Sequence, residues 1–199
     1  MALLIHLNGP SGIGKSTVAR RYADLHPGVL DLDADQVVMM IGGWRTALRD
    51  TLPAARRLAL AMAETHLRAG HDVVMPQLVA RVEQAERLEE AARAAGSEYV
   101  EIMLAAPRPQ AKARFAARGE HAAADAMAEL GGPDALDRIH DHVAEYLPLR
   151  PQCTVVDTEH LDPDETCARV AEIVARRAAA EVPSARNGDQ TGSVPPGPA

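Results

Sequence analysis

The decapeptide NGPSGIGKST, residues 8–17, places three glycines, a lysine and two adjacent hydroxyl residues directly after an apolar run. Gly9, Gly14, Lys15 and Ser16 stand at the spacing G-x-x-x-x-G-K-[ST]. Glycines let the backbone wrap closely and turn several N–H groups toward phosphate oxygens. The lysine reaches the β- and γ-phosphates as a mobile charge, and the serine hydroxyl can ligate Mg²⁺. The stretch therefore predicts a phosphate-binding loop.

The sequence on either side of this loop supports the prediction. Residues 3–7 form a short apolar run that suits a buried parallel strand. Residues 18–25 have helical spacing, and the positive amino-terminal end of such a helix attracts an anion. Lysine occurs only at positions 15 and 112 among 21 basic residues, so its presence in the motif is informative. The residues expected to contact the nucleotide are Gly9, Pro10, Ser11, Gly12, Ile13, Gly14, Lys15, Ser16 and Thr17.

Composition limits the classes of function. The length of 199 residues suits one domain with a substantial core, which we place at 1–180, followed by a disordered Pro/Gly/Ser-rich tail at 181–199. A net charge of −7 disfavours general nucleic-acid binding, because that needs clustered Lys and Arg. The apolar amino terminus is too short for a membrane span and lacks the basic flank of a signal peptide. We therefore expect a cytoplasmic protein without a nucleic-acid partner.

Short apolar runs alternate with helical patterns along the chain. The runs predict strands at 3–7, 29–33, 72–76, 99–106 and 154–158. Helical spacing predicts helices at 18–25, from 35 to the glycines at 42–43, and at 53–69, 80–95, 109–118, 133–146 and 163–180. Such alternation is typical of an α/β fold, with an open parallel sheet covered by helices on both faces.

Aspartates occupy alternate positions where the second predicted strand ends, at Asp31, Asp33 and Asp35. In an open α/β sheet the ligand crevice lies beyond the carboxyl ends of the strands, so Asp33 and Asp35 are expected near the γ-phosphate. One carboxylate can hold Mg²⁺ and the other can accept a proton from an attacking hydroxyl. We assign Asp33, with Ser16, to the metal and Asp35 to the catalytic base. The alternative is that an aspartate here caps the following helix.

The first strand, the loop GPSGIGKST and the aspartates after the second strand resemble the small-molecule P-loop kinases grouped with shikimate kinase, gluconate kinase and adenylate kinase. The arrangement is also similar to chloramphenicol phosphotransferase, in which an aspartate after strand two is the catalytic base. The middle of the chain resembles the ATP-binding tunicamycin-resistance protein. Its WR, VP and R-x-x-x-R segments correspond here to Trp44-Arg45, Met75-Pro76 and Arg114/Arg118.

This resemblance spans roughly residues 2–178 and implies a five-stranded parallel sheet, a small helical lid at about 114–132, and ATP with Mg²⁺ as cofactors. Arg114 and Arg118 are four residues apart and therefore share a helix face. As lid arginines they would act with Lys15 on the charge of the transferred phosphoryl group. Without the resemblance, the same two arginines are interpreted as a solvated helix face.

One feature departs from the kinase pattern. The third predicted strand ends VVMPQ, where an acidic residue would normally help to hold magnesium, and Asp72 stands at the start of that strand. Magnesium must then depend on Ser16 with Asp33 or Asp35, or else turnover is weak.

The acceptor is expected between the end of the second strand and the long helix that follows. The candidate residues are Asp35, Met39, Met40, Trp44, Arg45, Arg49 and Gln77. Four of them have a plainer interpretation as well: Trp44 as a core or surface-anchor residue, Arg45 in a surface salt bridge, and Met39 and Met40 as core.

The sequence thus predicts an enzyme, an ATP- and Mg²⁺-dependent phosphotransferase that acts on a hydroxyl of a small molecule. An antibiotic or another natural product is one acceptor class, and a bulky amphiphilic molecule suits Met39, Met40 and Trp44 better than a small sugar does. Two alternatives stay open. The first is an ATP-binding protein that sequesters a ligand, with feeble hydrolysis or none. The second is a nucleoside monophosphate or sugar-acid kinase.

Overall fold

The computed structural model describes residues 1–117 and 134–180. Its strands are β1 (Leu3–Asn8), β2 (Leu30–Asp31), β3 (Val73–Pro76), β4 (Glu98–Ala105) and β5 (Thr154–Asp157). Its helices are α1 (Lys15–Leu25), α2 (Ala34–Met39), α3 (Leu48–Arg68), α4 (Val82–Ala94), α5 (Arg108–Ala116), α7 (Ala135–Tyr146) and α8 (Pro163–Ala180), with a 3-10 turn η1 (Leu147–Leu149).

The strands form one parallel sheet in the order β2-β3-β1-β4-β5. Parallel neighbours need crossover connections, which the helices between the strands supply. β1 lies in the middle, paired with β3 on one side and with β4 on the other. The loop that follows β1 therefore leaves the centre of the sheet at its carboxyl edge. These observations confirm the predicted α/β fold with a five-stranded parallel sheet.

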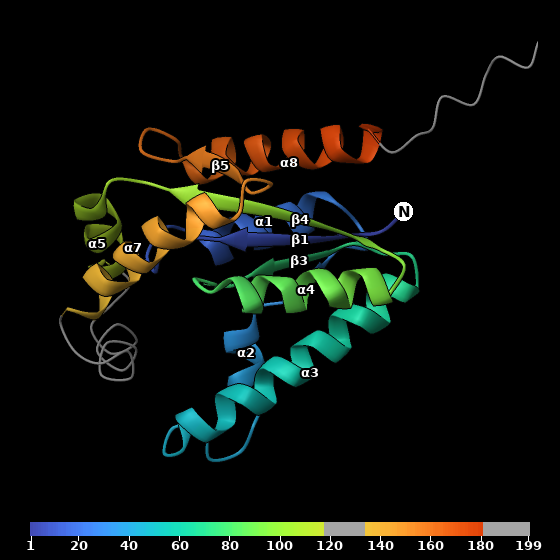
Figure 1. Ribbon diagram of the computed structural model, residues 1–199, viewed down its shortest axis with the longest axis horizontal. Coiled ribbons are helices and arrows are strands. Elements are labelled where there is room, and N and C mark those ends of the chain that lie inside the picture. The colour runs from blue at the N-terminus through green and yellow to red at the C-terminus, as the bar shows by residue number, and fades with distance from the viewer. Residues whose placement is uncertain (118–133, 181–199) are drawn as a thin grey trace, which may run out of the picture.

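Helices cover both faces of the sheet (Figure 1). Side chains alternate along β1, so that Leu3, Ile5 and Leu7 pack toward α1 and α8, whereas Leu4 packs toward α3 and α4. Because both faces are buried, the strands appear in the sequence as continuous apolar runs. On α3 the buried residues recur every four positions, at Thr51, Ala55, Ala59, Ala63 and Leu67.

Most predicted elements begin or end within a few residues of the observed ones, and two of the differences have a clear physical cause. The strand predicted at 29–33 shortens to Leu30–Asp31, because Asp33 leaves it to cap α2, where its Oδ1 accepts a hydrogen bond from the Asp35 N–H (3.0 Å). The helix predicted from residue 53 begins at Leu48, with Pro53 inside it. Leu48 and Leu52 pack against the core, so apolar contacts extend the helix on the amino-terminal side of the proline.

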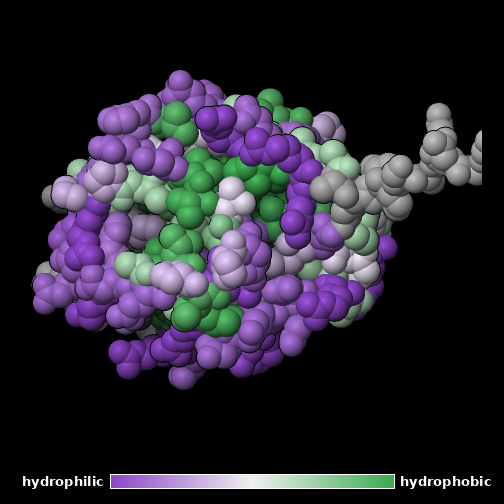
Figure 2. Space-filling view, turned by 45° about the horizontal axis from the view of Figure 1, so that its top comes forward, coloured by the Kyte–Doolittle hydropathy of each residue, from purple (hydrophilic) through white to green (hydrophobic). Residues whose placement is uncertain are grey.

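On the face that Figure 2 shows, apolar residues gather near the middle within a hydrophilic rim. No helix in the described part of the chain is both long and apolar enough to cross a membrane.

Of the lid predicted at 114–132, only residues 114–117 are described, and 114–116 belong to α5. Arg118 and the tail at 181–199 lie outside the described residues.

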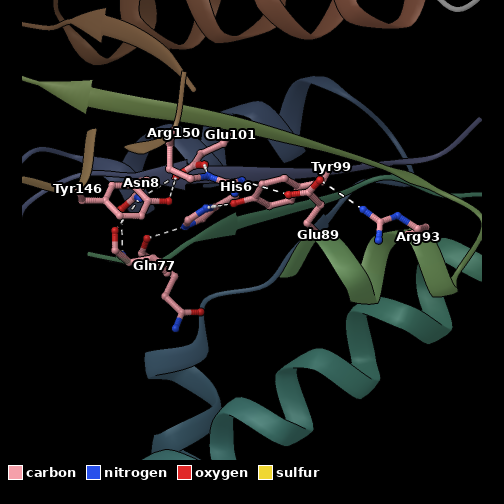
Figure 3. A network of polar contacts seen from close by, with 10 residues as sticks. His6, Asn8, Gln77, Glu89, Arg93, Tyr99, Glu101, Tyr146 and Arg150 are labelled. Carbon is pink, nitrogen blue, oxygen red and sulfur yellow. Dashed lines mark hydrogen bonds and ion pairs between the residues drawn. The ribbon is translucent and has the colours of Figure 1, made fainter. Parts of the chain in front are cut away.

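Polar side chains are buried on the face of the sheet that packs against α4 and α7 (Figure 3). His6 of β1 is fully buried, with Nε2 2.8 Å from the carbonyl oxygen of Gln77. A carbonyl oxygen only accepts, so Nε2 carries the proton, and Nδ1 accepts from the Tyr99 hydroxyl at 2.7 Å. Burial lowers the pKa of His6, although the nearby Glu101 carboxylate opposes that shift. The folded chain therefore favours neutral His6.

Because the folded chain favours neutral His6, we expect its stability to decrease in acid. Below pH 6.5, the ordinary pKa of a histidine side chain, His6 of the unfolded chain takes up a proton more readily than His6 of the folded chain. The free energy of unfolding should then fall as pH drops from 7.5 to 5.5, by at most about 1.4 kcal/mol per pH unit for one proton. His140, whose pKa is also lowered, chiefly by burial, adds to the same trend. Urea unfolding of the wild type and of His6→Gln at several pH values measures the difference.

His6→Gln should show the shallower pH dependence, because the neutral amide cannot be protonated in this range. His160→Gln serves as the control, since the His160 side chain is 88% exposed. Equal slopes for the wild type and His6→Gln would mean that burial of His6 does not govern the acid response.

Candidate active site at the phosphate loop

The loop between β1 and α1 takes a shape that depends on glycine. Gly14 has a φ of +104° and stands at the amino-terminal cap of α1. Gly12 has a φ of +89°, and a Cβ there would lie 2.4 Å from the carbonyl oxygen of Ala111 and 2.8 Å from Cβ of Phe115. No larger residue fits at Gly12 without displacing backbone. The loop is therefore packed directly against α5.

Lys15, the first residue of α1, turns back over this loop. Its Nζ donates to the carbonyl oxygens of Gly9 (2.8 Å) and Pro10 (3.0 Å). The ammonium group is thus held among the loop residues that were predicted to surround phosphate. A positive charge there, beside the amino-terminal end of α1, makes the loop a favourable place for an anion.

The structure brings Ser16 and Asp33 together, as the metal assignment required. The Ser16 hydroxyl donates to Oδ2 of Asp33 at 2.8 Å, while Oδ1 of the same carboxylate caps α2. Carboxylate oxygens are ligands that Mg²⁺ prefers, and it commonly uses one or two of them together with substrate phosphates and waters. In the described ranges, no three His, Cys, Asp or Glu side chains gather around a possible metal position. The residues present fit a magnesium ion that also depends on phosphate oxygens.

Asp35 is the second residue of α2 and lies near the same pair. Its pKa is raised, first because protein atoms around the carboxyl desolvate it, and next because Asp33 is close by. Lys15 and Arg56 act in the opposite direction, so both positive charges lie within electrostatic reach of Asp35. The helix cap considered as the alternative role for these aspartates belongs to Asp33.

The residues proposed for the acceptor lie mainly on α2 and the segment that follows it. Met39 and Met40 are 56% and 77% exposed, so they do not fill the core. Trp44 packs partly against the core, and the guanidinium carbon of Arg45 lies 4.6 Å from the centroid of its ring. This geometry is that of a cation–π contact.

The other two acceptor candidates stand apart from this group. Arg49 is exposed in the first turn of α3. Gln77 is half-buried at the carboxyl end of β3. Its carbonyl oxygen accepts a hydrogen bond from His6, and its N–H donates to the carbonyl oxygen of Leu7. Binding of an acceptor by any of these residues stays a prediction.

Arg114 reaches a different part of the site. Its guanidinium donates to the hydroxyl of Thr158 (3.3 Å) and to the carbonyl oxygen of the same residue (3.0 Å). Thr158 is buried directly after β5, and its N–H bonds the carbonyl oxygen of Ala105. Arg114 is therefore half-buried and anchored at the carboxyl edge of the sheet instead of being simply solvated. Its action on a phosphoryl group stays a prediction.

Sequence reasoning missed a set of polar residues behind the loop. Asn8 accepts hydrogen bonds from the N–H groups of Gly9 (2.8 Å) and Val79 (2.9 Å). Glu101 is buried within β4 and lies 3.1 Å from the Asn8 amide nitrogen. The available signal was a carboxylate inside the apolar run at 99–106, because a buried charge requires partners.

Three solved structures show the same fold as this chain. The tunicamycin resistance protein of Deinococcus radiodurans has a TM-score of 0.59 and 15% identity, covering 88% of this chain and 96% of that chain. Shikimate kinase from Acinetobacter baumannii, in complex with shikimate, has a TM-score of 0.63 and 18% identity, covering 89% of this chain and 95% of that chain. A gluconokinase from Sinorhizobium meliloti 1021 has a TM-score of 0.57 and 17% identity, covering 89% of this chain and 94% of that chain.

At these identities the likeness is one of fold. No curated protein matches the chain. A family model described as an AAA domain matches residues 4–131, which include the phosphate loop and the aspartates after β2. That match covers more than half of the chain, and the chain belongs to this family of P-loop domains.

Proposed function

We propose that this chain is an ATP- and Mg²⁺-dependent phosphotransferase that transfers the γ-phosphoryl group to a hydroxyl of a small molecule. The observation that carries the proposal is the 2.8 Å hydrogen bond between Ser16 and Asp33. It joins the hydroxyl of the phosphate loop to the carboxylate after β2, and Asp35 lies near this pair. The fold shared with shikimate kinase and gluconokinase supports a small-molecule acceptor.

Each residue of the site has a role in this proposal. The loop N–H groups and Lys15 bind the β- and γ-phosphates and stabilise negative charge on the transferred group. Ser16 and Asp33 would hold Mg²⁺, which when bound neutralises phosphate charge. Asp35 accepts the proton of the attacking hydroxyl, and its raised pKa brings it closer to the working pH. Arg114 and Arg118 would close over the phosphates.

The acceptor side favours an amphiphilic molecule. The exposed methionines at 39 and 40 offer apolar surface next to the carboxylate proposed as the base. Trp44 and Arg45 add an aromatic ring and a positive charge in the same segment. An antibiotic or related natural product has this mixed character, and the fold shared with a tunicamycin resistance protein supports that class. A sugar acid, or a nucleoside monophosphate, is the competing acceptor class.

One observation favours a second function. β3 ends at Pro76 and is followed by Gln77, so no carboxylate stands at its carboxyl end to help hold magnesium. Asp72 lies at the other end, where its Oδ1 accepts a hydrogen bond from the N–H of Leu3. A protein that binds ATP and sequesters a ligand without transferring phosphate would need no such carboxylate.

Replacement of Asp35 separates the two functions. Asp35→Asn removes the proton acceptor while keeping the size of the side chain, so a kinase should lose about 10²- to 10⁴-fold in acceptor-dependent ADP release. ATP affinity should stay close to that of the wild type. The assay runs Mg-ATP against a panel of hydroxylated antibiotics, nucleosides, nucleoside monophosphates, sugars and sugar acids.

Lys15→Ala is compared in the same assay, because it removes the ammonium group that is proposed to bind phosphate. If no acceptor stimulates ADP release and ATP still binds, the sequestering function replaces the kinase. Turnover confined to a sugar acid would reject the amphiphilic acceptor but keep the phosphotransferase.

The magnesium assignment predicts a change in how ATP affinity depends on the metal. Asp33→Asn keeps an oxygen that can cap α2 but loses the charge beside Ser16, so α2 should stay intact. The gain in ATP affinity that Mg²⁺ produces should shrink by at least about tenfold, or 1.4 kcal/mol. Titrations of ATP with and without Mg²⁺ at constant ionic strength measure it.

The exposed Asp24 offers the control, because Asp24→Asn removes the same charge elsewhere in the chain. A magnesium effect that survives intact in Asp33→Asn would assign the ion to other ligands.

A further inference from the structure

Asn8 links two segments of the site through one carboxamide. It is the last residue of β1 and is fully buried. Its Oδ1 accepts from the N–H of Gly9 (2.8 Å) and from the N–H of Val79 (2.9 Å), while its Nδ2 donates to the carbonyl oxygen of Val79 (2.8 Å). The first residue of the phosphate loop is thereby fixed relative to the segment that follows β3.

The carboxylate of Glu101 favours the same direction of this carboxamide as the backbone of Val79 does. Oε1 of Glu101 accepts from Nδ2 of Asn8 at 3.1 Å. If the amide rotated by half a turn, its oxygen would face the carboxylate, and its NH₂ group would face the N–H groups of Gly9 and Val79. Such contacts leave buried donors and acceptors unpaired, which disfavours the rotated amide.

Glu101 is itself held from the far side of the network (Figure 3). Its Oε1 accepts from the Tyr146 hydroxyl at 2.5 Å, and its Oε2 accepts from Nε of Arg150 at 3.1 Å. Arg150 is also buried and makes a second ion pair with Glu89 of α4 at 3.2 Å. Residues that end α7 and follow η1 therefore fix the carboxylate that orients Asn8.

We propose that Glu101 is a positioning residue for the phosphate loop and acts through Asn8. The carboxylate keeps the Asn8 oxygen on the N–H of Gly9, which holds the start of the loop in the shape that receives phosphate. This inference rests on the proposed function only in that the loop binds a nucleotide, and it does not depend on phosphoryl transfer.

Glu101→Gln tests the proposal with a side chain of the same size. The charged Arg150 draws the amide oxygen of the new side chain, so its NH₂ group faces Nδ2 of Asn8. Two donors then meet, and their repulsion shifts the Asn8 amide relative to Gly9, while Val79 still contacts it from the other strand connection. We expect the Kd for ADP, measured by calorimetry without any acceptor, to rise about tenfold. Hydrogen exchange of the peptide that spans residues 8–17 should speed up in parallel.

Asn8→Asp combined with Glu101→Gln reverses the polarity of the contact between the two side chains but keeps the contact, because the aspartate accepts from the NH₂ group of the new glutamine. Both variants that carry Asn8→Asp share the loss of the hydrogen bond to the carbonyl oxygen of Val79, so they are compared with each other. Asn8→Asp alone sets two carboxylates against each other and should bind ADP more weakly than the double variant. This order of affinities also tests the proposal if Glu101→Gln alone does not fold.

Tyr99→Phe is the matched structural control. It removes a buried hydrogen bond of the same network, the one to His6, and Tyr99 makes no described hydrogen bond to Asn8. It should lower thermal stability and leave ADP affinity within about twofold, since the loop contact is intact.

Two results would overturn the proposal in distinguishable ways. If Lys15→Ala weakens ADP binding but Glu101→Gln does not, Glu101 is only structural. If neither change affects ADP binding, the loop does not hold the nucleotide, and the proposed function fails together with the inference.

Discussion

The parallel pairing of β1 between β3 and β4 is the constraint on which the rest of the structure depends. It makes the loop after β1 a neighbour of the segments that follow the two adjacent strands. Val79 after β3 bonds Asn8 on one side. On the other side the loop contacts α5, which follows β4, at Gly12. Among the described residues, the loop of the proposed site is therefore bordered by connections at one edge of one sheet.

A second consequence is the crowding of charge at that edge. The carboxylate of Asp33 has two oxygens with separate partners, the start of α2 and the hydroxyl of Ser16. Asp35 is left with a raised pKa, because desolvation and Asp33 outweigh the attraction of Lys15 and Arg56. A cation between the aspartates and the phosphates would reduce this repulsion. The helix cap, the proposed metal position and the proposed proton acceptor are thus parts of one electrostatic arrangement.

Local patterns made the fold and the loop predictable, whereas contacts between distant residues did not. Buried parallel strands give continuous apolar runs, and the phosphate loop carries its residues within eight positions. The predicted start of α3 at Pro53 was wrong. Proline favours the first turn of a helix, but core packing extends this helix on the amino-terminal side of Pro53. The partner of Glu101 is Arg150, 49 residues away, and no periodicity indicates which arginine neutralises a buried acid.

Stability alone does not explain why a carboxylate and a guanidinium are buried in β4 and after η1. Well-packed apolar residues of similar volume are often as stable as a buried ion pair, or more stable, because desolvation costs offset the attraction. A carboxylate differs from an apolar side chain in that it distinguishes the two ends of a neighbouring amide. Glu101 makes that distinction at Asn8, next to Gly9. A protein that only binds ATP would need this fixed orientation of Asn8 as much as a kinase would. Glu101 therefore does not separate the two proposed functions, whereas Asp35 does.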